Sequence, residues 1–228
     1  MFAADRLKKG SAEYTAGDRM DAILFDFDGT LLDSMESKSR LAVEIFGRYL
    51  VLRDPELARQ RFLETSGQPF IVQTRLLFPE VGEPIRERIT EEYHMLVRGL
   101  KPNLKVFEEV PQVLGELHKK YSLAISSSSR QDELNYWVDQ YGLRPYFAAV
   151  LGTDGEFHKG KPHIEFIRQQ FNPAKIYVVG DSPADMAAAT AAGAIPIGRV
   201  GTVPESILRK AGALHTVKDL TGLFRILE

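Results

Sequence analysis

The sequence predicts an α/β fold, in which a mostly parallel, doubly wound, Rossmann-like sheet carries helices on both faces and a small all-helical insertion interrupts the chain. Three observations lead to this prediction. Short apolar runs break off into polar turns, segments with helical spacing lie between those runs, and one long stretch contains no convincing strand. At 228 residues the chain is long enough for one full domain and a smaller insert.

Six short apolar runs are the predicted strands. The first, at 22–25, ends abruptly at Asp26, Asp28 and Gly29, as a buried strand does when it enters a polar turn. The others lie at 123–125, 148–151, 176–179, 194–197 and 214–217. Ligands of parallel sheets bind beyond the carboxyl ends of the strands, and the polar clusters of this chain follow those ends.

The stretch from about Ser34 to Lys101 predicts a helical insertion, because its apolar residues recur at helical intervals, as at Leu41, Ile45 and Tyr49. The chain is therefore expected to divide into an N-terminal extension at 1–19, an α/β core at 20–33 and 102–228, and a helical cap at 34–101. The extension is expected to be weakly ordered, since the first strand begins only after Met20.

Composition excludes several classes of protein. The formal net charge of -2 offers no global attraction to nucleic acid or to an anionic membrane, so neither is an expected partner. The chain contains no cysteine, which excludes disulfides, thiol nucleophiles and thiolate metal sites. Residues 1–20 lack the apolar core of a signal peptide, and a cytoplasmic location is expected. Oligomeric state cannot be deduced from these patterns.

Asp26 and Asp28 lie two residues apart just past the first strand, where an extended backbone would direct both carboxylates to the same side. One carboxylate of such a pair can attack phosphorus, while the other passes a proton to the leaving group and later takes one from water. The alternative is a solvated turn, since Asp and Gly are common turn residues.

The segment ILFDFDGTLLDS, from Ile23 to Ser34, resembles the first motif of the haloacid dehalogenase superfamily. Further motifs follow in the family's order: Ser127 in LAISSSS, Lys161 in KGKPH, and Asp181 with Asp185 in GDSPAD. The resemblance extends over about residues 20–200. Within the family, the second acid Asp28 argues against a dehalogenase or a phosphonate hydrolase.

The resemblance implies a Mg²⁺ ion held by the carboxylate of Asp26, the backbone carbonyl of Asp28 and the carboxylate of Asp181. It also implies that Lys161, which Pro162 follows, neutralises the transferring phosphoryl group, whereas Lys159 is expected to be a solvated surface charge. Asp185 is expected to support the metal site from behind. It also fits a capping box with Ser182, in a helix that Pro183 would begin and Gly193 would end.

Ser127 is expected to donate its hydroxyl to a phosphate oxygen, and the backbone amides of Ser128 and Ser129 would add further donors. The alternative is helix capping by one of these serines, ahead of a segment that starts near Gln131.

Residues 65–69, in the predicted insertion, are a candidate specificity loop, and an ordinary turn between helices is an equally good interpretation. Other candidates for contact with substrate carry no assignment, because such residues are more often at the surface: Arg40, Arg48, Arg75, His158 and His163.

The function predicted from the sequence is hydrolysis of a small phosphorylated metabolite, of the phosphoglycolate or sugar-phosphate type, through a phosphorylated Asp26. Two alternatives remain open at this stage. A sugar-phosphate mutase would use the same residues and return the phosphoryl group to a hydroxyl. A non-catalytic module would bind magnesium or phosphate without turnover. The motifs do not choose among phosphoglycolate, a sugar phosphate and a nucleotide.

Overall fold

A computed structural model describes residues 20–227, and its centre is a six-stranded parallel sheet in the order β5-β4-β1-β6-β7-β8. The strands are β1 (Ala22–Phe25), β4 (Ser122–Arg130), β5 (Ala149–Thr153), β6 (Ile176–Gly180), β7 (Ile195–Arg199) and β8 (His215–Val217). All six predicted strands are confirmed. The predicted extension at 1–19 lies outside the described residues. Because β1 pairs with both β4 and β6, its carboxyl end opens beside theirs.

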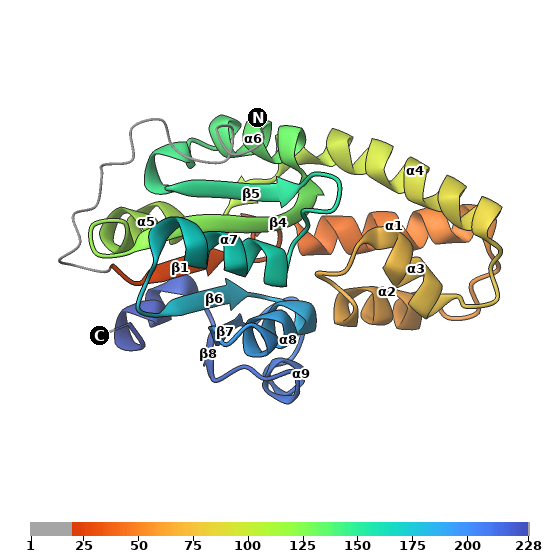
Figure 1. Ribbon diagram of the computed structural model, residues 1–228. Coiled ribbons are helices and arrows are strands. Elements are labelled where there is room, and N and C mark those ends of the chain that lie inside the picture. The colour runs from red at the N-terminus through yellow and green to blue at the C-terminus, as the bar shows by residue number, and fades with distance from the viewer. Residues whose placement is uncertain (1–19, 228) are drawn as a thin grey trace.

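Helices cover both faces of the sheet (Figure 1). Alternation along β1 separates the two cores, since Ile23 and Phe25 belong to one cluster and Ala22 and Leu24 to the other. The first cluster includes side chains of α5 (Val110–Leu117) and α6 (Gln131–Gln140), and the second includes side chains of α7 (Lys161–Phe171) and α8 (Pro183–Ala191). A further helix, α9 (Glu205–Lys210), packs against α8 and β7. The predicted doubly wound α/β fold is therefore confirmed.

Four helices form the insertion: α1 (Met35–Tyr49), α2 (Pro55–Glu64), α3 (Phe70–Leu77) and α4 (Glu83–Leu100). They pack around their own apolar cluster, in which the rings of Phe70 and Tyr93 stack with centroids 3.7 Å apart. Figure 1 shows the four helices gathered beyond the carboxyl ends of the strands. Among residues 20–227, no helix combines the length and the apolar character needed to cross a membrane.

The chain crosses between the sheet and the insertion twice, and the two crossings pair with each other. Strand β2 (Leu32–Asp33) on the way out lies antiparallel to β3 (Lys105–Val106) on the way back, with Leu32 opposite Val106. Sequence analysis missed both strands, because two residues carry no alternating pattern. Helices α1 to α4 fall within the proposed cap at 34–101, whose division from the core at 20–33 and 102–228 stays a prediction.

Candidate active site

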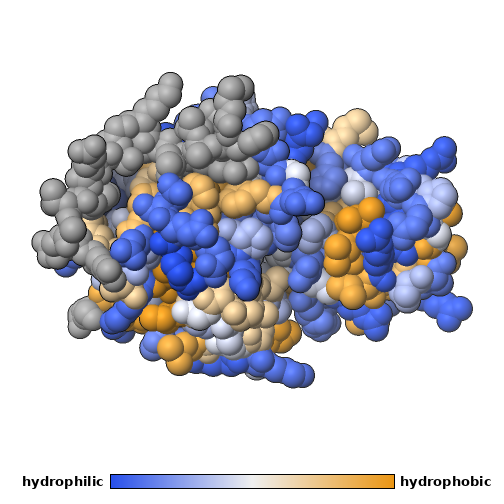
Figure 2. All heavy atoms as spheres, in the orientation of Figure 1, coloured by the Kyte–Doolittle hydropathy of each residue, from blue (hydrophilic) through white to orange (hydrophobic). Residues whose placement is uncertain are grey.

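A cavity of about 520 Å³ lies between the carboxyl ends of the strands and the helical insertion. Asp26, Asp28, Lys159 and Asp181 line it from the sheet side, and the residues that line it from the insertion include Lys38, Ser66, Gly67, Gln68, Pro69, Phe70, Gln73, Tyr93, His94 and Arg98. Figure 2 shows that the side chains of the visible face are mostly hydrophilic, with apolar groups exposed on the insertion. A small polar molecule inside the cavity would contact both parts of the protein.

Asp26 follows β1 directly and is 7% exposed. Its backbone N–H donates to the carbonyl of Val179 at the end of β6, which continues the sheet by one bond. Its Oδ1 accepts from Nζ of Lys159 at 2.7 Å. Burial raises the pKa of Asp26 well above its usual value, Lys159 opposes that shift, and the carboxylates of Asp185 and Asp181 add to it.

Asp28 lines the same cavity, so the expectation that both carboxylates face one side is confirmed. Its Oδ1 accepts from the hydroxyl of Ser34 at 2.8 Å, and its Oδ2 pairs with Nζ of Lys38 at 2.8 Å. Lys38 belongs to α1, and its side chain is 14% exposed. Sequence analysis missed it, because a lysine on a helix gives no sign that folding will place it over a carboxylate.

Asp181 follows β6 and is 1% exposed. The hydroxyl of Thr30 donates to its Oδ1 at 3.4 Å, and the hydroxyl of Thr202 donates to its Oδ2. Burial raises the pKa of Asp181, the charge of Asp185 adds to the rise, and the bond from Thr202 opposes it. Thr202 lies in the loop after β7, a segment in which sequence analysis identified no site residue.

Asp185 lies in the first turn of α8 and joins two structural roles. The hydroxyl of Ser182 accepts from the backbone N–H of Asp185 at 3.2 Å and donates to its Oδ2 at 2.6 Å. The other carboxylate oxygen pairs with Nζ of Lys159 at 2.7 Å. Pro183 begins the helix and Gly193, with φ of 65°, follows its C-terminal cap, so the predicted capping pattern is confirmed.

The buried acids form a cluster that fits a hard divalent cation. Asp26, Asp181 and Asp185 each offer a carboxylate oxygen, and these oxygens lie within 4.8 Å of one another. Only one buried ammonium, that of Lys159, pairs with carboxylates of this cluster among the described residues. Since Mg²⁺ prefers oxygen ligands and is usually held by one or two carboxylates, the donor set suits this ion. Asp185 is committed to Ser182 and Lys159, which leaves Asp26 and Asp181 as the freer ligands.

The lysine of the site is Lys159, and the expectation for Lys161 is wrong in this respect. Nζ of Lys159 lies 2.7 Å from both Asp26 and Asp185, and its side chain is 11% exposed. Burial alone lowers the pKa of Lys159, but the two carboxylates outweigh it and the net shift is upward. Lys161 is exposed, because it is the first residue of α7 and the chain turns at Gly160, where φ is 107°, before that helix.

The serine tract ends β4 at the edge of the cavity, which Ser128 and Ser129 line. Ser127 is 2% exposed, and its Oγ accepts from the N–H of Ser129 at 3.1 Å. The predicted contacts of Ser127 and Ser128 with phosphate stay predictions. No serine caps α6, since Arg130 occupies the N-cap position without a side-chain bond to the helix.

The candidate specificity loop joins α2 to α3 and also borders the site. Ser66, Gly67, Gln68 and Pro69 line the cavity. Gly67 has φ of 83°, and a Cβ there would lie 2.4 Å from Oγ of Ser182, so the loop touches the start of α8. The amide of Gln73 holds the loop from behind by donating to the carbonyl of Gln68 at 2.9 Å.

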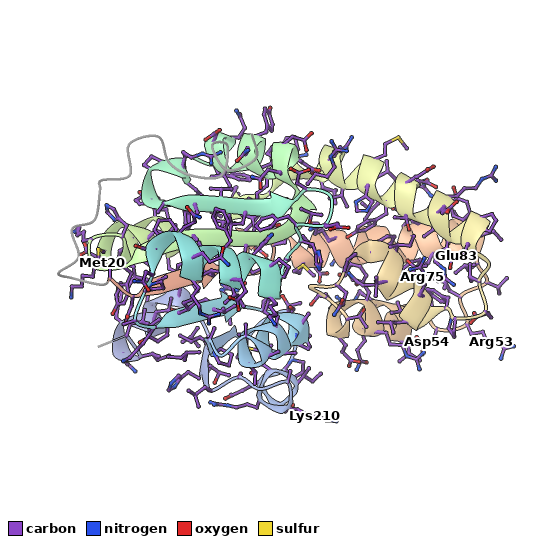
Figure 3. All side chains as sticks on the ribbon, in the orientation of Figure 1. Met20, Arg53, Asp54, Arg75, Glu83 and Lys210 are labelled. Carbon is purple, nitrogen blue, oxygen red and sulfur yellow. The ribbon has the colours of Figure 1, made fainter. Side chains whose placement is uncertain are left out.

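The unassigned basic residues of the insertion form surface ion pairs: Arg40 with Glu36, Arg48 with Glu44 and Glu92, and Arg75 with Glu83. Figure 3 shows Arg75 beside Glu83 at the end of the insertion farther from the sheet. His163 is buried and shares a hydrogen bond of 2.9 Å with Ser126, whereas His158 is exposed.

Comparison with known proteins agrees with this arrangement. The chain is 28% identical to the phosphoglycolate phosphatase of Synechococcus elongatus, over 78% of this chain and 82% of that protein. It is 29% identical to the phosphorylated carbohydrates phosphatase of Thermotoga maritima, over 87% and 94%. A haloacid dehalogenase-like hydrolase from Streptococcus pneumoniae superimposes with a TM-score of 0.78 at 17% identity, covering 92% of this chain and 99% of that one, and thus shares the fold. The family model of haloacid dehalogenase-like hydrolases matches residues 23–198, and the chain therefore belongs to that family.

Proposed function

We propose that this protein is a magnesium-dependent phosphatase of a small phosphorylated metabolite, of the phosphoglycolate or sugar-phosphate type, and that it works through a phosphorylated Asp26. The observation that carries the proposal is the pairing of Asp26 and Asp28 at one cavity, with a buried ammonium on Asp26 and a second acid, Asp181, beside it. The names of the two relatives, which act on phosphoglycolate and on phosphorylated carbohydrates, support the substrate class.

In the first step, an oxygen of Asp26 bonds to phosphorus as the bond from phosphorus to the ester oxygen breaks, and Asp28 gives its proton to the departing alcohol. In the second step, water bonds to phosphorus, Asp28 takes the proton of that water, and the bond from phosphorus to Asp26 breaks. Inorganic phosphate and the original carboxylates are the result. Both steps use the same two carboxylates, because Asp28 returns to its starting protonation state.

Asp26, Asp181 and the backbone carbonyl of Asp28 would hold the Mg²⁺ ion, whose chemistry is to neutralise the phosphate and the carboxylate that attacks it. Lys159 takes the role expected of Lys161, since it holds Asp26 by a hydrogen bond and places a positive charge where the phosphoryl group would arrive. The amides of Ser128 and Ser129, at the edge of the cavity, supply further donors to phosphate oxygens. A cytoplasmic location is part of the same proposal.

A screen of phosphorylated metabolites for release of inorganic phosphate tests the proposal. Wild-type protein is expected to release phosphate with Mg²⁺ and to stop when EDTA removes it, and Asp26→Asn is expected to abolish release while its circular dichroism stays that of the wild type. Retained turnover in this variant would reject the nucleophile. Isomerisation of a sugar phosphate without release of phosphate would instead identify the mutase alternative.

A further inference from the structure

A buried arginine lies behind the proposed active site, at the end of β7. Arg199 is 7% exposed, and its guanidinium contacts three segments that are far apart in the sequence. Its Nη1 donates to the carbonyl of Gly29 at 3.3 Å, and its Nη2 donates to Glu109 at 3.2 Å. Its Cζ lies 3.5 Å from the centroid of the Phe107 ring.

These contacts compensate for a burial that would otherwise be unfavourable. A buried charge is tolerated when it is paired and hydrogen-bonded, and here a carboxylate, a carbonyl and an aromatic face share that task. Compensation is incomplete, because Nε of Arg199 has no hydrogen-bond partner in the part of the chain that the structure describes. Only a planar, forked cation can make both hydrogen bonds and stack on the ring, so lysine would not replace it.

The outgoing contact reaches the loop that carries both catalytic acids. Gly29 follows Asp28 directly, has φ of 81°, and would place a Cβ 2.1 Å from Oδ2 of Asp181. Its backbone is therefore pressed against the carboxylate of Asp181 on one side and held by Arg199 on the other. A displacement of Gly29 would change the spacing between Asp28 and Asp181.

The other contacts reach the segment that returns from the insertion. Phe107 follows β3 directly, and its N–H donates to the carbonyl of Leu31 at 3.0 Å, while Glu109 occupies the N-cap position of α5. Glu109 also accepts from the N–H of Leu220 at 3.4 Å, which fixes it to the C-terminal part of the core. One side chain of the sheet thus contacts both crossings between the sheet and the insertion.

We propose that Arg199 is a positioning residue, which anchors both crossings to the sheet and keeps the loop of Asp26 and Asp28 in register with Asp181 while the insertion moves. This inference goes beyond the proposed function, because it concerns the chain path behind the site and not a group that touches substrate. It assigns a role to a residue that lies outside all of the family motifs recognised in the sequence.

Hydrogen–deuterium exchange of folded variants tests the anchor without any substrate. Arg199→Lys is expected to speed exchange at the amides of Gly29, Leu31, Leu32 and Phe107, and to leave β5 at the far edge of the sheet unchanged. Glu109→Gln, which keeps the arginine, is expected to give the same pattern more weakly and decides the matter if Arg199→Lys does not fold. Arg209→Met is the matched control, because Arg209 also pairs with a glutamate but lies at the surface.

Kinetics test the positioning role and rest on the proposed function. Arg199→Lys is expected to lower kcat by roughly 10- to 100-fold with a much smaller change in KM, since small displacements of catalytic groups have effects of this size. Unchanged exchange at these four amides would overturn the anchor, and faster local exchange with unchanged kcat would overturn the positioning role. If the wild type releases no phosphate from any ester, the proposed function fails and exchange alone decides this inference.

Discussion

At the scale of single residues, the site is organised around one buried positive charge. Lys159 pairs with Asp26 and Asp185, so it both orients the proposed nucleophile and offsets part of the charge of the acid cluster. Asp28 has a different partner, Lys38, which the insertion supplies. The two acids of the motif therefore lie in different electrostatic settings, as groups with different roles in catalysis should.

The two lysines of the KGK segment are expected to respond differently to substitution. Lys159→Met should lower kcat by roughly 100-fold or more, because removal of a preorganised electrostatic group at a reacting centre has effects of this size. Lys161→Met should leave kcat close to that of the wild type, since Lys161 is exposed. Steady-state phosphate release by both variants checks this. Equal losses would contradict the assignment of Lys159.

Asp28 is expected to matter most when the leaving group needs a proton. Asp28→Asn should lower kcat by up to about 100- to 10,000-fold for an alkyl phosphate, the range typical of general acid–base catalysis, and by less for p-nitrophenyl phosphate. The smaller loss follows because p-nitrophenolate leaves without protonation. Rates with the two esters, measured for wild type and variant under one set of conditions, give the comparison. Equal losses would count against Asp28 as the acid.

At the scale of elements, the loop between α2 and α3 connects recognition to the acid cluster. Gly67 touches Ser182, which caps α8 and bonds to Asp185, and Asp185 pairs with Lys159. The insertion therefore contacts the proposed catalytic centre through backbone as well as through the side chain of Lys38.

Gly67→Ala is expected to lower both stability and kcat/KM. The positive φ costs about 1–2 kcal/mol for a residue with a Cβ, and the new methyl group would clash with Ser182 and Ala184. Gly99→Ala is the matched control in α4, where a Cβ meets nothing within 4 Å; helix propensity predicts a gain of up to about 1 kcal/mol there. Thermal melts and kcat/KM with one substrate compare the two. A Gly67 variant that matches the control would show that the loop adapts.

The elements of the sheet could be predicted from the sequence because each is an apolar run between turns, and β1 matches its predicted bounds. Strands β2 and β3 could not be predicted, since a pair of two-residue strands exists only through a contact between positions 32 and 106. The acids of the site followed from their motifs. Lys159, Lys38 and Thr202 did not, because their roles depend on where the fold places a lysine or threonine that looks ordinary in sequence.

At the scale of the whole molecule, the acid cluster sets how stability depends on pH and metal. Burial and the charge of Asp185 raise the pKa of Asp181 in the folded chain. Between the pKa values of the unfolded and folded states, the folded chain binds more protons, so this group lowers the free energy of unfolding as the pH rises through that interval.

Asp181→Asn removes that effect. In EDTA, the variant is expected to melt above the wild type near pH ~7, and the difference should shrink as the pH falls toward about 4, where a carboxyl of the unfolded chain takes up its proton. Each kcal/mol should change Tm by about 2–4 °C in a chain of this size. Adding Mg²⁺ should reverse the order, because the cation stabilises only a chain that binds it. A variant that melts below the wild type in EDTA would contradict this account.

The pairing of β2 with β3 has a consequence for how such a protein can diversify. Because Leu32 lies opposite Val106, the two points at which the insertion leaves and rejoins the sheet are neighbours, and everything between them forms a detour. Replacing that detour with another helical module would leave the route of the chain through the sheet intact. The architecture thus permits the choice of metabolite to evolve separately from the machinery that breaks the phosphate ester.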